Sequence, residues 1–152
     1  TAQAANSDVQ VLSQDLTKTW QLEDNSINVV FSSNFLEHLP TKDAILHTFK
    51  EAHRVLAPGG KIILLGPNIR FCYDVYWDFF DHYIPLSDRS VNEALNLEGF
   101  ETIKSIDRFL PFSMQNKVPT HPLLVSLYLR MPFAWPYFGK QFLIVANSNK
   151  KK

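Results

Sequence analysis

This sequence of 152 residues contains one cysteine and five glycines, and its formal net charge at pH 7 is zero. Long apolar runs are also scarce. Its single cysteine, Cys72, excludes an internal disulfide bond and a zinc site built from cysteine thiolates. The scarcity of cysteine is compatible with a reducing compartment, and we expect a cytoplasmic protein. Basic and acidic residues number 15 each, so no overall field would attract nucleic acid or an anionic membrane, and we expect no nucleic-acid partner.

No apolar run is long enough to span a membrane. The most apolar window, residues 123–138, is interrupted by Arg130, Pro132 and Pro136, whereas a span needs about 20 apolar residues. The window therefore belongs to a core, a lid or an interface. With 45% hydrophobic and 20% charged residues, the chain has the composition of one globular domain.

The domain boundaries follow from changes in this pattern. We expect one partial domain over residues 1–147 and a solvated tail at 148–152, where three lysines follow a polar stretch. Residues 67–86 crowd aromatic side chains among acidic ones without a clear period, and we interpret them as a lid or insertion. A second lid or insertion segment is expected at 110–138.

The centre of the chain has the pattern of strand, helix and strand. The apolar run at 27–31 predicts a strand buried on both faces. Thr41 is a good N-cap, and apolar residues at helical spacing predict a helix from there to about residue 56. Pro58 and Gly59 predict its end, and residues 61–65 predict a second strand, parallel to the first. Because the glycines follow a helix and precede a strand, they do not have the position of a phosphate-binding loop.

Weaker patterns predict the remaining elements. Residues 8–12 predict a short strand, a serine at 87 or 90 begins a helix that ends at Gly99, and residues 100–109 and 140–146 predict two more strands. Residues 120–131 are apolar nearly all round, which predicts a helix buried on several sides or docked on a partner. Strands that alternate with helices predict a three-layer α/β sandwich with a mostly parallel sheet.

Residues 8–66 resemble the class I S-adenosylmethionine-dependent methyltransferases of the type 11 group. The resemblance rests on the sequences NVVFS at 28–32, FLEHL at 35–39 and LAPGG at 56–60. It implies a Rossmann-like methyltransferase fold with S-adenosyl-L-methionine as cofactor. The implied cofactor-binding residues follow two strands of the family's sheet, and they are Asp15, Leu16, Ser32, Asn34 and Phe35.

Two of these residues have a structural alternative. Asp15 falls where the family contacts adenine, but an aspartate in a turn also binds its own backbone. Phe35 either forms a wall of the cofactor site or is an ordinary core aromatic. Ser32 and Asn34 come at the end of a central strand, where open α/β sheets bind ligands.

Two histidines are candidates for a general base, because imidazole titrates near neutral pH. His38 follows the first central strand and His82 lies on the predicted lid. Their neighbours Glu37, Asp81 and Tyr83 are candidate substrate-binding residues. The alternatives are a loop-orienting role for His38 and a packing role for the pair at 81–82. The spacing of histidine and acidic residues indicates no metal site.

The chain departs from the family in two places. Asn28 replaces an aspartate that opens the corresponding strand. The family's first strand, its GxGxG loop and the acidic residue after its second strand have no counterpart, and residue 1 is threonine. We therefore expect a fold incomplete at its N-terminus, and a chain that is inactive on its own.

The missing strands would leave an open sheet edge. The family's strand order is 3-2-1-4-5-7-6, so its fourth strand, here 27–31, would lose its neighbour and expose unpaired backbone groups. We expect either a homodimer that covers this edge or an N-terminal segment that moves in to pair with it.

The leading functional hypothesis is a methyltransferase that acts on a small molecule by direct methyl displacement. Residues 81–87, 108–111 and 138–141 resemble a subgroup associated with sugar and polysaccharide pathways, which implies a sugar-linked substrate. The alternative is a non-catalytic, truncated module that acts through protein association. A nicotinamide dehydrogenase would share the architecture, but its glycine fingerprint is absent.

Overall fold

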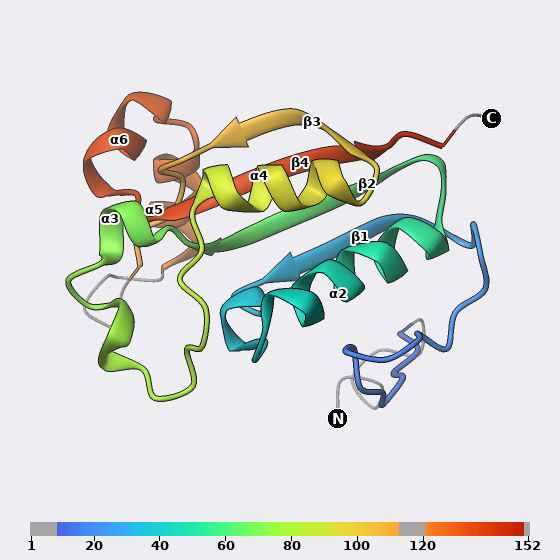
Figure 1. Ribbon diagram of the computed structural model, residues 1–152. Coiled ribbons are helices and arrows are strands. Elements are labelled where there is room, and N and C mark those ends of the chain that lie inside the picture. Colours follow the sequence, from blue (N-terminus) through green and yellow to red (C-terminus); the bar gives the residue numbers. More distant parts are fainter. Residues whose placement is uncertain (1–8, 113–120, 151–152) are drawn as a thin grey trace.

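The computed structural model describes residues 9–112 and 121–150 (Figure 1). These residues form one four-stranded sheet in the order β1-β2-β4-β3. The strands are β1 (Ile27–Ser33), β2 (Leu56–Pro67), β3 (Phe100–Ile106) and β4 (Gln141–Ser148). Strands β1 and β2 pair in parallel, whereas β4 runs antiparallel to both of its neighbours, β2 and β3. The sheet is mixed, so the expectation of a mostly parallel sheet was wrong.

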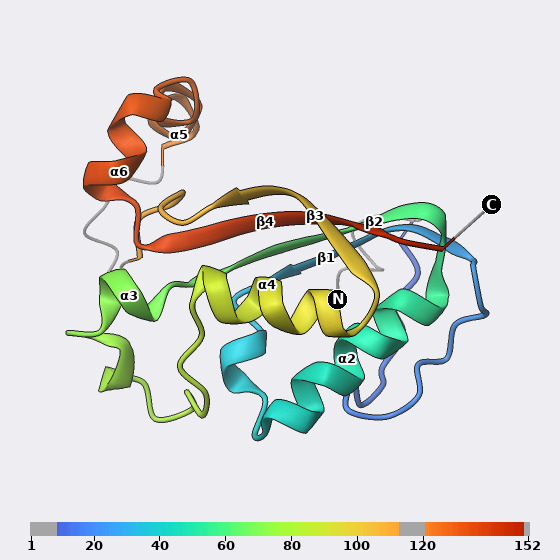
Figure 2. The same cartoon turned by 45° about the horizontal axis from the view of Figure 1, so that its top comes forward.

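The two main helices lie on the same face of this sheet. They are α2 (Lys42–Val55) and α4 (Asp88–Leu97), and Figure 2 shows both beneath the strands. The shorter helices are η1 (Leu36–His38), α3 (Ile69–Cys72), η2 (Tyr76–Asp78), α5 (Pro122–Leu129), η3 (Pro132–Ala134) and α6 (Trp135–Phe138). Helices α5 and α6 project from one end of the sheet on its other side. Among the described residues the two main helices cover one face of the sheet, and the three-layer sandwich stays a prediction.

Helix α2 forms as the sequence predicts. The Thr41 hydroxyl accepts a hydrogen bond from the Ala44 amide at 3.1 Å, which caps the first turn. One stripe of the helix faces the sheet and is buried, and this stripe forms the core with side chains of β2 and β4. The core members from these elements include Ile45, Phe49, Ala52, Val55, Ile62, Leu64, Phe142 and Ile144.

The turn at the two adjacent glycines is confirmed. Gly59 has a φ of +76°, which favours glycine, and the pairing of β1 with β2 shifts register here. At Gly60 a Cβ would lie 2.8 Å from the Ala57 carbonyl oxygen, so only glycine fits. Strand β2 begins at Leu56, earlier than predicted, because the chain is already extended as it leaves α2.

Helix α4 begins at the first of the two predicted caps. The Ser87 hydroxyl accepts a hydrogen bond from the Ser90 amide, and the Ser90 hydroxyl accepts one from the Ser87 amide, which makes a capping box. Gly99, with a φ of +81°, follows the end of the helix as predicted.

The described part of the N-terminal segment, residues 9–26, packs on α2 and does not join the sheet. Residue 8 lies outside the described residues, and residues 9–12 form no strand, so a strand at 8–12 is not found. The Trp20 amide donates to the Glu51 carboxylate at 2.8 Å, and Arg54 donates to the carbonyl oxygens of Trp20 and Leu22. These bonds hold residues 9–26 beside the helix, so of the two alternatives for the open edge, pairing with an N-terminal segment is not found among the described residues.

Strand β1 is therefore an edge of the sheet among the described residues, as expected. Its side chains Val29 and Phe31 are 51% and 64% exposed, and no residue of β1 is buried, so the expectation of a strand buried on both faces was wrong. The predicted helix at 120–131 forms as α5, although residue 120 lies outside the described residues and no residue of α5 is buried. The expectation that this helix is buried on several sides was wrong, which leaves docking on a partner. In the described part of the chain, no helix is both long and apolar enough to cross a membrane.

Candidate functional site

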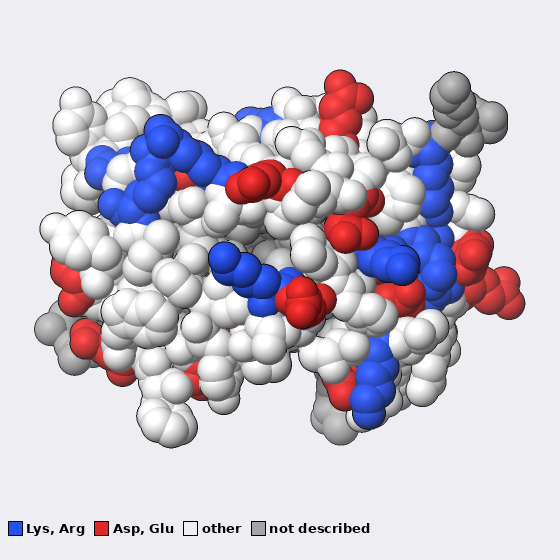
Figure 3. Space-filling view, viewed as in Figure 1, with Lys and Arg blue, Asp and Glu red and all other residues white. Residues whose placement is uncertain are grey.

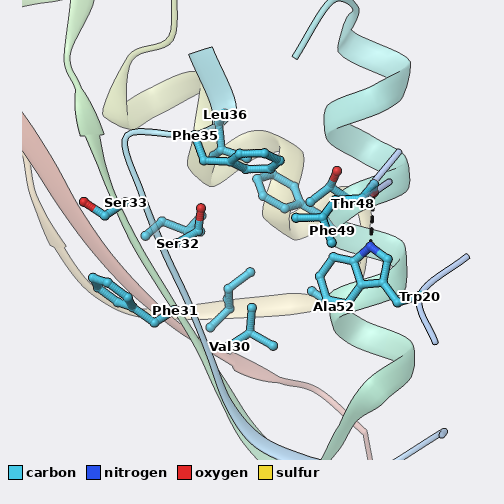
Figure 4. Close-up of a pocket in the computed structure, with 13 residues that line it drawn as sticks. Trp20, Val30, Phe31, Ser32, Ser33, Phe35, Leu36, Thr48, Phe49 and Ala52 are labelled. Carbon is cyan, nitrogen blue, oxygen red and sulfur yellow. Dashed lines mark hydrogen bonds between the residues drawn. The ribbon is translucent and has the colours of Figure 1, made fainter. Parts of the chain in front are cut away.

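A pocket of about 260 Å³ opens at the carboxyl end of β1, between this strand, α2 and the N-terminal segment (Figure 4). Its lining includes Leu16, Ser32 and Phe35, three of the five residues predicted to bind the cofactor. Trp20 lines the side nearest α2, and its indole N–H donates to the Leu16 carbonyl oxygen at 3.1 Å. The structure thus brings residues from two separate segments to one pocket. The other lining residues are Val30, Phe31, Ser33, Leu36, Thr48, Phe49, Ala52, Ile62 and Leu64.

The other two predicted cofactor residues do not line this pocket. The Asp15 carboxylate accepts hydrogen bonds from the amide and hydroxyl of Thr17 at 3.0 and 2.7 Å, and these bonds lower the pKa of Asp15. Its contacts are those of the turn aspartate given as the alternative. Asn34 has a φ of +47°, and its amide donates to the Leu65 carbonyl oxygen at 2.9 Å. A non-glycine residue in this conformation is uncommon, and it turns the chain sharply where β1 ends.

A second group gathers the two candidate histidines with their acidic neighbours. His38 Nδ1 lies 3.2 Å from an Asp81 carboxylate oxygen and 3.1 Å from the Asp81 carbonyl oxygen. The Tyr83 amide donates to the Glu37 carbonyl oxygen at 2.9 Å, which ties the segment after β1 to the predicted lid. The rings of His38 and His82 are 5.2 Å apart. Residues that the sequence suggested separately therefore form one cluster.

Burial changes the proton affinities in this cluster. Glu37 is buried, and desolvation raises the pKa of its carboxyl group. Its Oε1 lies 4.0 Å from His38 Nε2. His82 is 6% exposed and stacks on Phe79 with ring centres 4.4 Å apart, and desolvation lowers the pKa of this histidine. Within the described residues, His82 Nδ1 has no hydrogen-bond partner. The cluster thus favours the neutral form of the His82 imidazole, and the Glu37 carboxyl group holds its proton more tightly than an exposed one does.

The same cluster has ligand types that suit a metal ion. One ligand atom each of Glu37, His38 and His82 lies within 4.8 Å of the others. Sequence spacing missed this group because Glu37 and His82 lie on different segments that meet only in the fold. No short motif could have shown it. Tyr83, the last predicted substrate-binding residue, is exposed at the rim of the cluster.

The methyltransferase domain family matches residues 1–64 of this chain. The match covers less than half of the 152 residues and nearly the whole of the region 8–66 that carries the resemblance. The order β1-β2-β4-β3 corresponds to the 4-5-7-6 part of the strand order given above for the family. The resemblance to class I S-adenosylmethionine-dependent methyltransferases is thus confirmed, and so is the position of β1 at the edge of the described sheet.

Solved methyltransferase structures share this fold at low sequence identity. An S-adenosylmethionine-dependent methyltransferase from Archaeoglobus fulgidus matches with a TM-score of 0.66 and 14% identity, over 96% of this chain and 71% of that one. One from Mesorhizobium loti has a TM-score of 0.62 and 15% identity, over 96% and 74%.

A third match lies in a complex of the Haloferax volcanii Trm112 methyltransferase activator with a protein described as a methyltransferase. Its TM-score is 0.63 and its identity 19%, over 93% of this chain and 61% of that one. No curated protein matches this sequence. The chain therefore spans about 60% to 75% of the length of these three methyltransferases.

Proposed function

We propose that this chain forms part of an S-adenosylmethionine-dependent methyltransferase, and that the pocket at the carboxyl end of β1 holds the adenosine end of the cofactor. The observation that carries the proposal is the convergence of Leu16, Ser32 and Phe35 on one pocket, at the end of the sheet where α/β folds bind ligands. The cofactor supplies an activated methyl group on a sulfonium. Transfer is a direct displacement, for which positioning supplies much of the rate.

The size and lining of the pocket fit part of the cofactor. A volume of about 260 Å³ lies just below the range of about 300–1,000 Å³ for ligand sites. The Phe35 and Trp20 rings suit a flat adenine, and the hydroxyls of Ser32 and Thr48 suit a ribose. The family's glycine loop would hold the rest, so we propose that this chain alone is inactive.

For the methyl acceptor we propose a small molecule with a hydroxyl group, linked to a sugar, with His38 as the general base. A hydrogen bond from the protonated Nδ1 of His38 to Asp81 leaves Nε2 unprotonated and able to take the acceptor's proton. Asp81 is then a positioning residue. His38 suits this role better than His82, because His38 is partly exposed whereas His82 is buried. Glu37 and Tyr83 would contact the acceptor from either side of this group.

Nuclear magnetic resonance of the isotope-labelled chain tests the pocket directly. Addition of S-adenosylhomocysteine should shift the amide signals of Leu16, Ser32 and Phe35. A second pocket, between α2 and α4, provides an internal control: Ile84 and Leu97 line it, and their signals should stay in place. Shifts confined to that second pocket, or no shifts at any cofactor concentration, would contradict the proposal.

The open edge of β1 supports a second proposal, a homodimer. Val29 and Phe31 are exposed beside unpaired backbone groups of an edge strand, which is a template for pairing with another chain. The alternative function, a non-catalytic module that acts through protein association, would also need pairing of this kind. In the complex with the Trm112 activator, a methyltransferase is bound to a protein partner. An activator protein of that kind is the other partner that could pair with this edge.

A further inference from the structure

Helices α5 and α6 form an apolar projection with little cover from the rest of the described chain. No residue of α5 is buried, and Leu123 and Leu127, one turn apart, are 73% and 56% exposed. Tyr137 of α6 is 82% exposed, and Phe138 is also exposed. A helix that is apolar all round is normally buried in a core or in lipid. An exposed apolar patch of this extent marks a contact surface.

The projection is held in a fixed position. The Tyr128 hydroxyl donates to the Phe109 carbonyl oxygen at 2.7 Å, and the Trp135 indole N–H donates to the Tyr128 carbonyl oxygen at 3.1 Å. The rings of Phe109 and Trp135 meet edge to face at 4.9 Å. Tyr128 and Trp135 thus anchor the projection, and its exposed apolar side chains face outward.

The charged side chains that belong to the projection or bond to it are basic. Residues 121–139 carry a single charged side chain, that of Arg130. Arg130 caps the C-terminal end of α5, and Arg108 donates to the Pro136 carbonyl oxygen of α6. Neither arginine forms an ion pair with another described residue, while Lys140 lies 3.4 Å from Asp74. In Figure 3 the corner formed by α5 and α6, at the upper left, is mainly uncharged and basic.

We propose that the α5–α6 projection docks on the surface of an anionic lipid bilayer. An eight-residue helix is about 12 Å long, whereas the hydrocarbon core is about 30 Å thick, so α5 can enter the interface but not cross it. Tryptophan and tyrosine favour this interface, and arginines beside it attract anionic headgroups. A second copy of the chain suits the projection less well, because symmetric packing would place Arg130 and Arg108 near their own copies.

This docking would bring the candidate site to the membrane. The segment between α3 and α4 carries Trp77 and Phe80, both exposed, at the same end of the molecule as α5 and α6 (Figures 1 and 2). The carboxyl end of β1 points toward that end. A lipid contact there would favour acceptors that reside in the membrane surface. The docking itself does not depend on the proposed methyl transfer.

Vesicle flotation of the full chain tests this inference. We expect the chain to float with vesicles of phosphatidylcholine mixed with phosphatidylglycerol, and less with phosphatidylcholine alone. The double variant Leu123→Gln, Leu127→Gln should lower the partition coefficient by about tenfold or more. The matched control Leu97→Gln, Ile103→Gln removes two side chains of similar exposure on α4 and β3, and should float as the wild type does.

A charge variant keeps the test valid if the double variant fails to fold. Arg130→Gln should reduce flotation with the anionic vesicles several-fold and leave the weaker binding to phosphatidylcholine unchanged. The inference is overturned if the wild type floats with neither vesicle, or if the leucine variant folds and floats as well as the wild type. It is also overturned if sedimentation shows self-association through these leucines without any flotation, which would make a second copy the partner.

Discussion

His38 Nδ1 lies 3.2 Å from the carboxylate of Asp81, a residue 43 positions later in the chain. The contact joins the short helix η1, which follows β1, to the segment between α3 and α4. The backbone bond from Tyr83 to Glu37 holds the two segments together beside it. This geometry leaves His38 Nε2 as the atom that can accept a proton, and it accounts for the role proposed for this histidine.

The first prediction concerns that role. In a version of the protein that is active, His38→Gln should lower kcat by about 10²- to 10⁴-fold, because a positioned general base contributes about that much. Asp81→Asn should have a smaller effect, since it disturbs only the orientation of the ring. Steady-state kinetics measure both, and cofactor affinity should stay the same. Asp78→Asn, an exposed change on the same segment, is the control, and an equal loss there would refute the assignment.

The second prediction concerns pH. Burial lowers the pKa of His82 below its ordinary value of 6.5, so the unfolded state binds its proton first as the pH falls. The contribution of His82 to stability is therefore present above that value and is lost as the pH falls through the pKa of the folded state. His82→Phe should flatten the decline in the free energy of unfolding as the pH falls below 6.5. Urea unfolding at a series of pH values measures it, and parallel curves for both proteins would contradict the prediction.

The third prediction concerns the bonds between α2 and the N-terminal segment. Arg54 pairs with Glu51 at 2.8 Å and with Asp24, and it also donates to two carbonyl oxygens of the segment. Arg54→Gln should lower the free energy of unfolding by about 1–3 kcal/mol, because several charge-assisted bonds are lost together. Limited proteolysis should then cut the segment sooner. Lys18→Gln, which removes an exposed pair with Asp15, should change neither the unfolding midpoint nor the cleavage rate.

Local signals in the sequence were sufficient for the centre of the fold. The cap at Thr41, the apolar stripe of α2 and the two glycines each act over a few residues, so strand, helix and turn were predicted correctly. The direction of β4 depends on a pairing between distant segments, and no local pattern encodes it. Residues 9–12 alternate like a strand, but the N-terminal segment makes its bonds to α2 through Trp20.

The candidate site likewise contains residues that the sequence predicted and contacts that it did not. Leu16, Ser32 and Phe35 were predicted through the family resemblance, and they meet at one pocket. The joining of His38 to His82 was not predicted, because it depends on how the segment after β2 folds back over η1. For α5, apolar composition left burial and docking on a partner as open alternatives, since composition does not say what covers the helix.

The fourth prediction concerns the tight turn before β2. A Cβ at residue 60 would lie 2.8 Å from the Ala57 carbonyl oxygen and 3.2 Å from that of Asn28, so Gly60→Ala forces backbone atoms apart. We expect the free energy of unfolding to fall by about 2 kcal/mol or more. Gly66→Ala is a milder comparison, because its nearest neighbour is the tip of the Phe142 ring at 3.0 Å. Equal denaturation midpoints for the Gly60 variant and the wild type would show that this turn is not the constraint inferred.

The fifth prediction concerns the open edge. If β1 pairs with a second copy, Val29→Lys should shift the sedimentation equilibrium from dimer to monomer, because a lysine on an edge strand opposes pairing. Ile103→Lys is a matched control, since Ile103 is also 51% exposed and lies on β3, the other edge of the described sheet. A wild type that sediments as a monomer at all concentrations would exclude the homodimer.

The most direct test of the account is calorimetric titration of S-adenosylhomocysteine into this chain and into a version extended at its N-terminus by upstream coding sequence. The account predicts that the extended version binds at least about tenfold more tightly, and that Phe35→Ala weakens this binding. Comparable micromolar binding by both versions would contradict the claim that this chain supplies only one side of the cofactor site. Binding that Phe35→Ala leaves unchanged would contradict the location of the site at the end of β1.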